Sequence, residues 1–245
     1  MTKNIKLVIE YDGTNYCGWQ RQKNALSIQQ VLETKLERLL KEKVKLTGSG
    51  RTDSGVHARC QVANFKTNSK LKPLAIKNAL NAKLPRDIII RNASFVSQDF
   101  HAQFDAKSKI YRYSIYNKDT NCVFCSKYIW WYKGKLDIGL MEKEAKVLLG
   151  KHDFSSFQAK DVKERSSIRT IKNIFVSKKG SFINITVEAN GFLYNMVRNI
   201  AGTLVEIGRY RFQAGSMKAI LAKKDRKFSG PTAPASGLCL VRVRY

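Results

Sequence analysis

Residues 48–58 read Gly-Ser-Gly-Arg-Thr-Asp-Ser-Gly-Val-His-Ala and isolate one carboxylate, that of Asp53, among glycines. A carboxylate in such a place can serve as a general base or as a nucleophile. The glycines do not form a dinucleotide motif, because Asp53 occupies the third glycine position, and Val56 stands where a phosphate-binding loop requires lysine. Four interpretations of Asp53 remain: a turn residue, a salt-bridge partner of Arg51, a metal ligand or a catalytic acid. Local sequence alone favours the turn or the salt bridge.

A second candidate is Arg198, within an apolar segment predicted to be a helix over residues 192–207. Helical spacing puts Tyr194, Arg198 and Gly202 on one ridge, beside a ridge of apolar residues. A guanidinium next to a buried face requires a fixed anion, which Asp53 or an RNA phosphate could supply. The alternative is that Arg198 extends to solvent along its aliphatic stem.

Tyr111 lies in the sequence Lys-Ile-Tyr-Arg-Tyr-Ser-Ile-Tyr at residues 109–116. If this segment is a strand, Tyr111, Tyr113 and Ile115 share one face, which is either an aromatic platform for a ligand or part of the core. The histidines at 57, 101 and 152 are far apart in sequence and lack a nucleophile or metal-binding partner nearby. We therefore expect hydrogen-bonded structural roles for them.

The elements that must position these residues can be predicted from periodicity, caps and turn signals. Strands are expected at 5–11, 44–47, 61–67, 88–96, 109–116, 128–133, 170–177, 182–189 and 238–245, and helices at 28–40, 74–84, 136–149, 192–207 and 216–223. This order predicts an α+β protein with two related halves, residues 1–104 and 105–245. The halves are expected to share a largely antiparallel sheet flanked by helices, with a basic active-site cleft between them.

The chain has 245 residues, with 45 Lys and Arg against 19 Asp and Glu, and a formal net charge of +26. Such a charge favours a polyanionic partner over a merely soluble basic protein. Cationic residues are interleaved with 10 tyrosines, 12 phenylalanines and three tryptophans, a combination suited to single-stranded or looped RNA.

Five scattered cysteines do not indicate a disulfide framework, and Cys122-Val-Phe-Cys125 lacks the second ligand pair of a metal site. Reduced cysteines are therefore expected. The N-terminus lacks the apolar run of a signal peptide and no segment has the length of a membrane helix, so we expect a cytoplasmic protein without membrane contact.

Taken with its context, the Gly-Arg-Thr-Asp-Ser-Gly-Val-His-Ala sequence at residues 50–58 resembles the signature of the TruA family of tRNA pseudouridine synthases. Further blocks resemble that family in the same order, and together they span nearly the whole chain: residues 11–14, 18–20, 61–65, 100–102, 109–113, 152–157, 192–202 and 234–240.

The resemblance implies a homodimeric, cofactor-free isomerase that flips uridines out of the anticodon stem-loop of tRNA and converts them to pseudouridine at positions 38, 39 and 40. It implies that Asp53 is catalytic, as a nucleophile at C1′ or as a base at C2′, and that Arg198 keeps it charged. It also implies that Tyr111 stacks on the flipped base, that Leu238 packs against Tyr111, and that Arg51 contacts RNA.

One departure from the family and two alternative functions need to be considered. Gln103 stands where the family commonly has arginine, so an RNA contact from that position is not expected. A non-catalytic RNA-binding or ribosome-assembly protein could share the fold and the charge. A nucleoside hydrolase or glycosidase is a weaker alternative, because the motif has no second carboxylate or metal to activate water.

Overall fold

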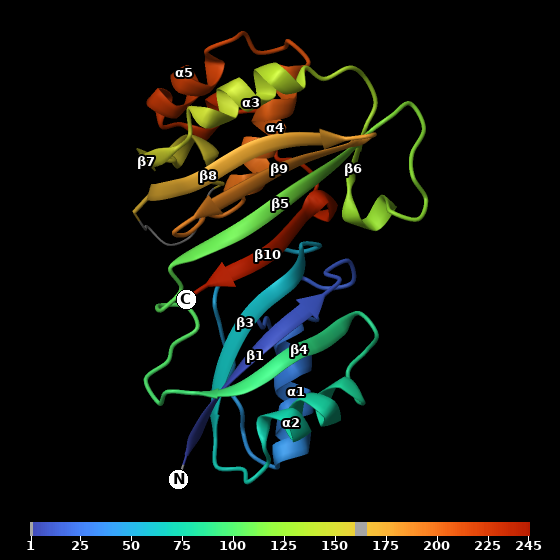
Figure 1. Cartoon of the computed structure of the whole chain (residues 1–245), viewed down its shortest axis with the longest axis vertical. Coiled ribbons are helices and arrows are strands. Elements are labelled where there is room, and N and C mark those ends of the chain that lie inside the picture. The colour runs from blue at the N-terminus through green and yellow to red at the C-terminus, as the bar shows by residue number, and fades with distance from the viewer. Residues whose placement is uncertain (1, 160–165) are drawn as a thin grey trace. The chain divides into compact units, whose positions relative to one another are not determined.

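The computed structural model describes residues 2–159 and 166–245, which form five α-helices and ten β-strands (Figure 1). Antiparallel pairing predominates, so the predicted α+β class with a largely antiparallel sheet flanked by helices is confirmed. The chain forms two compact units, residues 1–107 with 240–245, and residues 108–239. The predicted boundary lay three residues earlier and left the last strand with the second half, whereas residues 240–245 belong to the first unit.

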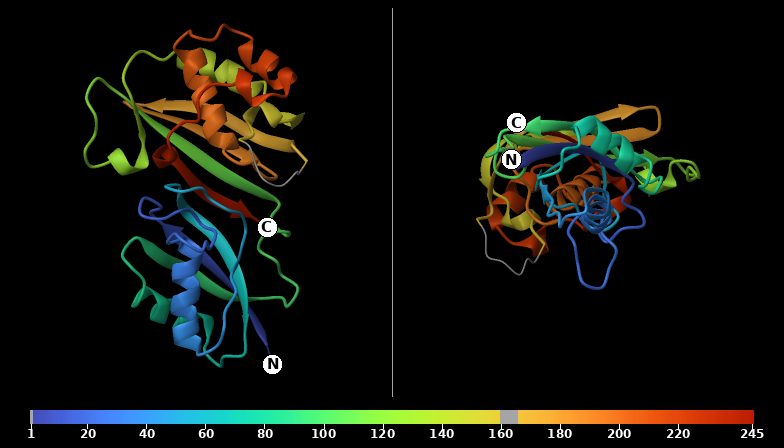
Figure 2. Two further views of the ribbon diagram at one scale, coloured as in Figure 1. Left: turned by 180° about the vertical axis from the view of Figure 1, so that it is seen from behind. Right: turned by 90° about the horizontal axis from the view of Figure 1, so that it is seen from below.

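The first unit is a sheet covered by two helices. Its elements are β1 (Lys3–Tyr11), α1 (Ile28–Leu40), β2 (Thr47–Gly48), β3 (His57–Thr67), α2 (Pro73–Asn81), β4 (Ile88–Val96) and most of β10 (Leu238–Arg244). The central strand β1 pairs antiparallel with β3 and β4, and β10 lies on the other side of β3. Alternate residues of β1, namely Ile5, Leu7 and Ile9, are fully buried, as a strand with one covered face requires. Both helices lie on the same face of the sheet (Figure 2).

Helix α1 begins where its capping signal predicts. The Ser27 side chain accepts a hydrogen bond from the Gln30 backbone N–H, which satisfies one donor of the first turn. The strand predicted at residues 44–47 is wrong except at its end, because only Thr47 and Gly48 pair with β3. Just before Thr47, the backbone bonds to a side chain of α1 instead of to a strand: Glu33 Oε1 accepts a hydrogen bond from the Leu46 backbone N–H at 3.0 Å.

The second unit is also a sheet with helices on one face. Its elements are β5 (Ser108–Asn117), β6 (Trp130–Tyr132), α3 (Ile138–Lys146), β7 (Gly150–Asp153), β8 (Ile168–Lys179), β9 (Phe182–Ala189), α4 (Met196–Gly208) and α5 (Ser216–Lys223). Strand β9 pairs antiparallel with β5 and β8, β7 extends the sheet beyond β8, and β6 pairs parallel with β5. Helices α3, α4 and α5 pack together over one face of this sheet (Figure 1).

Helix α4 begins four residues later than predicted. Asn195 has a left-handed conformation, with φ of 59°, and the helix runs only from Met196. A left-handed residue cannot continue a right-handed helix, so the apolar residues upstream form a turn instead. The consequence for the site is that Arg198 lies in the first turn of α4 rather than in its middle, and Tyr194 lies outside the helix.

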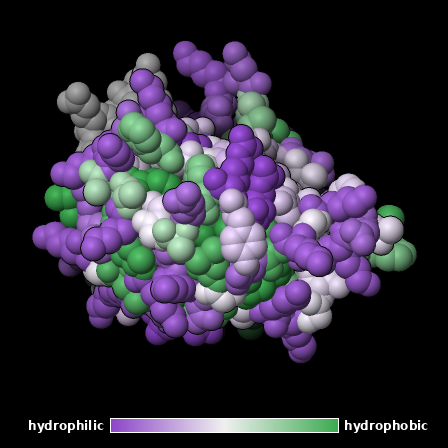
Figure 3. All heavy atoms as spheres, turned by 90° about the horizontal axis from the view of Figure 1, so that it is seen from above, coloured by the Kyte–Doolittle hydropathy of each residue, from purple (hydrophilic) through white to green (hydrophobic). Residues whose placement is uncertain are grey.

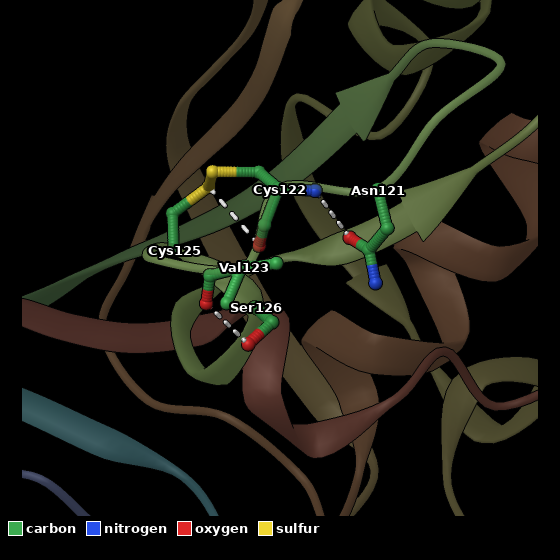
Figure 4. The surroundings of a disulfide bond; sticks show 5 residues. All are labelled: Asn121, Cys122, Val123, Cys125 and Ser126. Atoms are coloured by element: carbon green, nitrogen blue, oxygen red, sulfur yellow. Dashed lines mark hydrogen bonds between the residues drawn. A yellow bond between two sulfur atoms is a disulfide. The ribbon is translucent and has the colours of Figure 1, made fainter.

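The prediction of reduced cysteines is wrong for one pair. Cys122 and Cys125 form a disulfide in the segment between β5 and β6 (Figure 4). Local hydrogen bonds hold this turn: Asn121 Oδ1 accepts from the Cys122 backbone N–H at 2.8 Å, and Ser126 Oγ donates to the Val123 carbonyl at 2.9 Å. The turn brings the two Cα atoms to 5.5 Å, within the range that a disulfide spans. Sequence spacing alone does not reveal that approach.

Hydrophilic side chains cover most of the face seen in Figure 3, with smaller apolar areas between them. Among the residues that the structure describes, no helix is both long and apolar enough to cross a membrane.

Candidate functional site

In the first unit, Asp53 lies on the loop that leads into β3. Its carbonyl oxygen accepts from the Val56 backbone N–H at 3.1 Å, and Gly55 has φ of 76°, so residues 53–56 form a tight turn. The backbone of Asp53 therefore lies in a turn, one of the interpretations that the sequence allowed. Its side chain is half-buried, while that of Arg51 is exposed.

The residue before Asp53 is held by both its backbone and its side chain. The Thr52 carbonyl accepts from the Trp19 backbone N–H at 3.0 Å, and the Thr52 hydroxyl lies 2.8 Å from the hydroxyl of Tyr11. On the other side of Asp53, the Tyr16 carbonyl accepts from the Gly55 backbone N–H at 3.3 Å. The segment that follows β1 thus fixes the backbone around the carboxylate.

Two glycines allow these chain segments to approach closely. Gly18 has φ of +83°, and a Cβ built there would lie 2.4 Å from the Thr52 carbonyl oxygen. A Cβ on Gly13 would lie 2.1 Å from the Val56 carbonyl oxygen. Both distances are far below any real contact, so side chains at these positions would push the Asp53 loop away.

Trp19 supports the beginning of the same loop. It is only 2% exposed, and a Cβ on Gly48 would lie 2.6 Å from its Nε1 atom. The indole therefore packs closely against Gly48. Sequence reasoning missed this supporting role of residues 11–19, although their matching family blocks and their glycines were visible signals.

All three histidines have the structural roles that we expected. His57 Nδ1 lies 3.0 Å from the Gly13 backbone nitrogen and 3.1 Å from Asp12 Oδ1, so the imidazole contacts both residues of the turn that follows β1. His101 Nδ1 accepts from two backbone N–H groups, and His152 Nε2 lies 2.7 Å from the Leu149 carbonyl.

In the second unit, Tyr111 lies on β5 and is 7% exposed. As the alternation predicts, it shares one face of that strand with Tyr113 and Ile115, and the structure shows that this face is buried. Its ring meets the ring of Phe192 edge-on, with centroids 5.0 Å apart. Sequence reasoning did not single out Phe192, because this contact joins two elements distant in sequence. Leu238 is also buried, and begins β10.

The Arg198 guanidinium is fixed by two neighbours in the same unit. Its Nε donates to the Ala233 carbonyl at 2.7 Å, and its Nη1 donates to Asn195 Oδ1 at 3.0 Å. The side chain is half-buried. Two hydrogen bonds at different nitrogens fix both the position and the plane of the guanidinium, so this side chain does not simply extend into solvent.

The Gly/Pro-rich segment at residues 229–234 is held against α4. The Thr203 hydroxyl accepts from the Gly230 backbone N–H at 2.9 Å, and the Thr232 hydroxyl donates to Asn199 Oδ1 at 2.7 Å. A Cβ on Gly202 would lie 1.8 Å from the Pro231 carbonyl oxygen. Because Ala233 belongs to this segment, its close packing determines where the carbonyl partner of Arg198 lies.

Among residues 2–159 and 166–245, no group of three or more His, Cys, Asp or Glu side chains lies together in a way that could hold a metal ion.

Comparison with known proteins places the chain in a family. A family model described as tRNA pseudouridine synthase matches residues 7–105 and 145–245. The chain is 46% identical over 243 residues to tRNA pseudouridine synthase A of Thermoanaerobacter sp. (strain X514), covering 99% of this chain and 100% of that protein. Identity is 46% to tRNA pseudouridine synthase A 2 of Clostridium perfringens and 47% to the synthase A of Clostridium kluyveri, with the same coverage.

The chain therefore belongs to the tRNA pseudouridine synthase family. The two matched segments include Asp53, Arg51, Arg198 and Leu238, whereas Tyr111 and the disulfide lie in the unmatched residues 106–144. A solved structure titled "Crystal Structure of a Cbf5-Nop10-Gar1 Complex" has a TM-score of 0.39 and 12% identity, covering 96% of this chain and 48% of that one, and is too distant to bear on this assignment.

Proposed function

We propose that this protein converts uridine to pseudouridine in the anticodon stem-loop of tRNA, at positions 38, 39 and 40. The observation that carries the proposal is the half-buried carboxylate of Asp53, on a turn fixed on both sides, in a member of this family with a net charge of +26. The reaction breaks the C1′–N1 bond, turns the base, joins C1′ to C5 and releases the C5 proton.

The roles of the residues follow from this chemistry. Asp53 acts while ionised, either attacking C1′ or removing the C2′ proton to give a glycal. Arg198 supplies the cation that stabilises the ionised carboxylate. Tyr111 packs against the flipped base, Leu238 closes the apolar wall beside it, and Arg51 contacts the RNA from which the nucleotide was extruded.

We further propose that the protein acts as a homodimer in the cytoplasm, with each tRNA contacting both subunits. The proposal is supported by positive charge distributed along the whole chain. Sedimentation of the purified protein tests it: a species of twice the chain mass agrees with the dimer, and a monomer that binds tRNA and is active contradicts it.

Release of tritium from a tRNA transcript labelled at C5 of uridine tests the activity. An isomerase replaces the C5 hydrogen by carbon, so tritium enters the water as pseudouridine forms. A non-catalytic RNA-binding protein would bind the transcript and release no tritium. A nucleoside hydrolase would release free labelled uracil. Either of these results would contradict the proposal.

A further inference from the structure

Strand register in the second unit brings two cations to one end of the sheet. Lys109 on β5 is paired with Ala189 on β9, and Ala189 is paired with Ile171 on β8. Directly paired residues point to the same face of a sheet, and so do residues two apart on one strand. Lys109 and Arg169 therefore share the face on which Tyr111 lies.

Lys109 is in an environment that disfavours a lone positive charge. Its side chain is half-buried, and burial lowers the pKa of its ammonium group; the nearby charge of Arg169 lowers that pKa further. A like-charged neighbour cannot compensate the desolvation of an ammonium group. An anion bound between the two cations would remove both penalties.

The surroundings of these cations point to a nucleotide rather than a small ion. Lys109 and Tyr111 are two residues apart on β5, or about 7 Å along an extended strand. Arg169 lies beside Gly191, where an added Cβ would be 3.5 Å from its Nε, and the next residue is Phe192, whose ring meets Tyr111. Cations and an aromatic pair thus lie side by side, as a phosphate and its base do in one nucleotide.

We propose that Lys109 and Arg169 form a binding site for an RNA phosphodiester, adjacent to the base that packs against Tyr111. The inference rests on the proposed function in one respect, that the ligand is RNA. Arg169 is oriented for this role by its own backbone neighbours, because its Nη1 donates to the carbonyls of Ser166 and Ile168, each at 2.7 Å. Lys109 supplies the second donor.

The experiment compares Lys109→Met with a matched variant, Lys178→Met, which removes an exposed lysine from β8 of the same unit. The ligand is an anticodon stem-loop transcript, and binding is measured between 50 and 400 mM KCl. Lys109→Met should weaken binding about tenfold, as the loss of a charge-assisted contact does. The slope of log K against log salt should become shallower by about 0.7 to 0.9.

Lys109→Arg should restore both affinity and slope, and Lys178→Met should stay within about twofold of the unmodified protein. In turnover, Lys109→Met should raise KM by the same factor while kcat changes less, because the contact exists before and during the reaction. Thermal unfolding checks that each variant is folded. The proposal would be overturned if Lys109→Met bound the stem-loop with the affinity and salt slope of the wild-type protein. It would also be overturned if Lys109→Met and Lys178→Met lost affinity and slope to the same extent.

Neutralising the RNA instead of the protein gives a second readout. Stem-loops carrying one methylphosphonate at successive positions should include one position that weakens binding to the wild-type protein but not to Lys109→Met. Equal losses in both proteins at every position would also overturn the site. If the wild-type protein makes no pseudouridine while Lys109→Met still loses affinity and slope, the proposed activity fails and the phosphate site stands.

Discussion

Tyr11 and Thr52 are joined through two buried hydroxyl groups whose oxygens are 2.8 Å apart. Tyr11 ends β1, and Thr52 directly precedes Asp53. This contact links the loop of the proposed catalytic carboxylate to the central strand of the first unit.

Tyr11→Phe removes the tyrosine hydroxyl, so the buried Thr52 hydroxyl loses this hydrogen bond. We expect kcat to fall about tenfold, equivalent to ~1.4 kcal/mol, with KM nearly unchanged, because the carboxylate is displaced rather than the RNA surface. Thr52→Val should have the same effect, Thr52→Ser should retain activity, and the double variant should lose little more than either single one. Tyr116→Phe, a hydroxyl removed in the other unit, is the control. An unchanged kcat in Tyr11→Phe would show that the contact does not position Asp53.

Gly18→Ala tests the close approach between residue 18 and the Asp53 loop. Gly180 is the matched control, because it too has a positive φ, of 56°, but an added Cβ would have no atom within 4 Å. Gly180→Ala should lower the free energy of unfolding by only about 1 to 2 kcal/mol, the cost of holding alanine in a left-handed conformation. Gly18→Ala should lower the free energy of unfolding by more than Gly180→Ala does. It should also lower kcat at least tenfold in the fraction of the protein that remains folded. Thermal unfolding and single-turnover rates measure the two effects, and equal behaviour of both variants would contradict the proposed packing.

Asn195 combines a left-handed backbone with a hydrogen bond to Arg198, and two substitutions separate these roles. Asn195→Gly keeps the conformation and loses the hydrogen bond, so it should lower kcat about fivefold to tenfold at nearly unchanged stability. Asn195→Ala should lower kcat equally and also destabilise the fold by about 1 to 2 kcal/mol. If Asn195→Gly has the kcat of the wild type, this hydrogen bond does not orient a catalytically important guanidinium.

The Cys122–Cys125 disulfide should be dispensable for activity. Its turn is held by local hydrogen bonds and lies outside the segments that match the family model. Closing so short a loop stabilises the fold by roughly 2 kcal/mol at most in the chain-entropy model. Pseudouridine formation by Cys122→Ser/Cys125→Ser, or by the protein in dithiothreitol, should equal that of the oxidised protein. A loss of activity on reduction that is reversed by reoxidation would contradict this expectation.

Features governed by local physics were predictable from the sequence. Helix α1 begins at the cap that Ser27 provides, and the alternation in β5 correctly places Tyr111, Tyr113 and Ile115 on one face. The beginning of α4 was not predictable, because apolar spacing does not reveal the left-handed Asn195. The strand β7 was missed, since four residues with two charges carry too little alternation to identify a strand.

In the candidate site, too, some features were predictable from the sequence and others were not. The loop of Asp53 was recognisable from its glycines, but its support by Tyr11, Gly13 and Trp19 depends on contacts across some 30 to 45 residues of sequence. Such contacts arise from tertiary packing, which no local pattern encodes. The orientation of Arg198 by the Ala233 carbonyl was hidden for the same reason.

The most direct test of the central claim is pseudouridine formation by Asp53→Asn, measured together with its affinity for tRNA. Asparagine keeps the size of the side chain but can neither attack C1′ nor accept a proton from C2′. Pseudouridine should fall below detection while tRNA affinity stays within about threefold, since phosphate contacts do not depend on this carboxylate. The exposed Asp99→Asn should remain fully active. Substantial pseudouridine formation by Asp53→Asn would contradict the account.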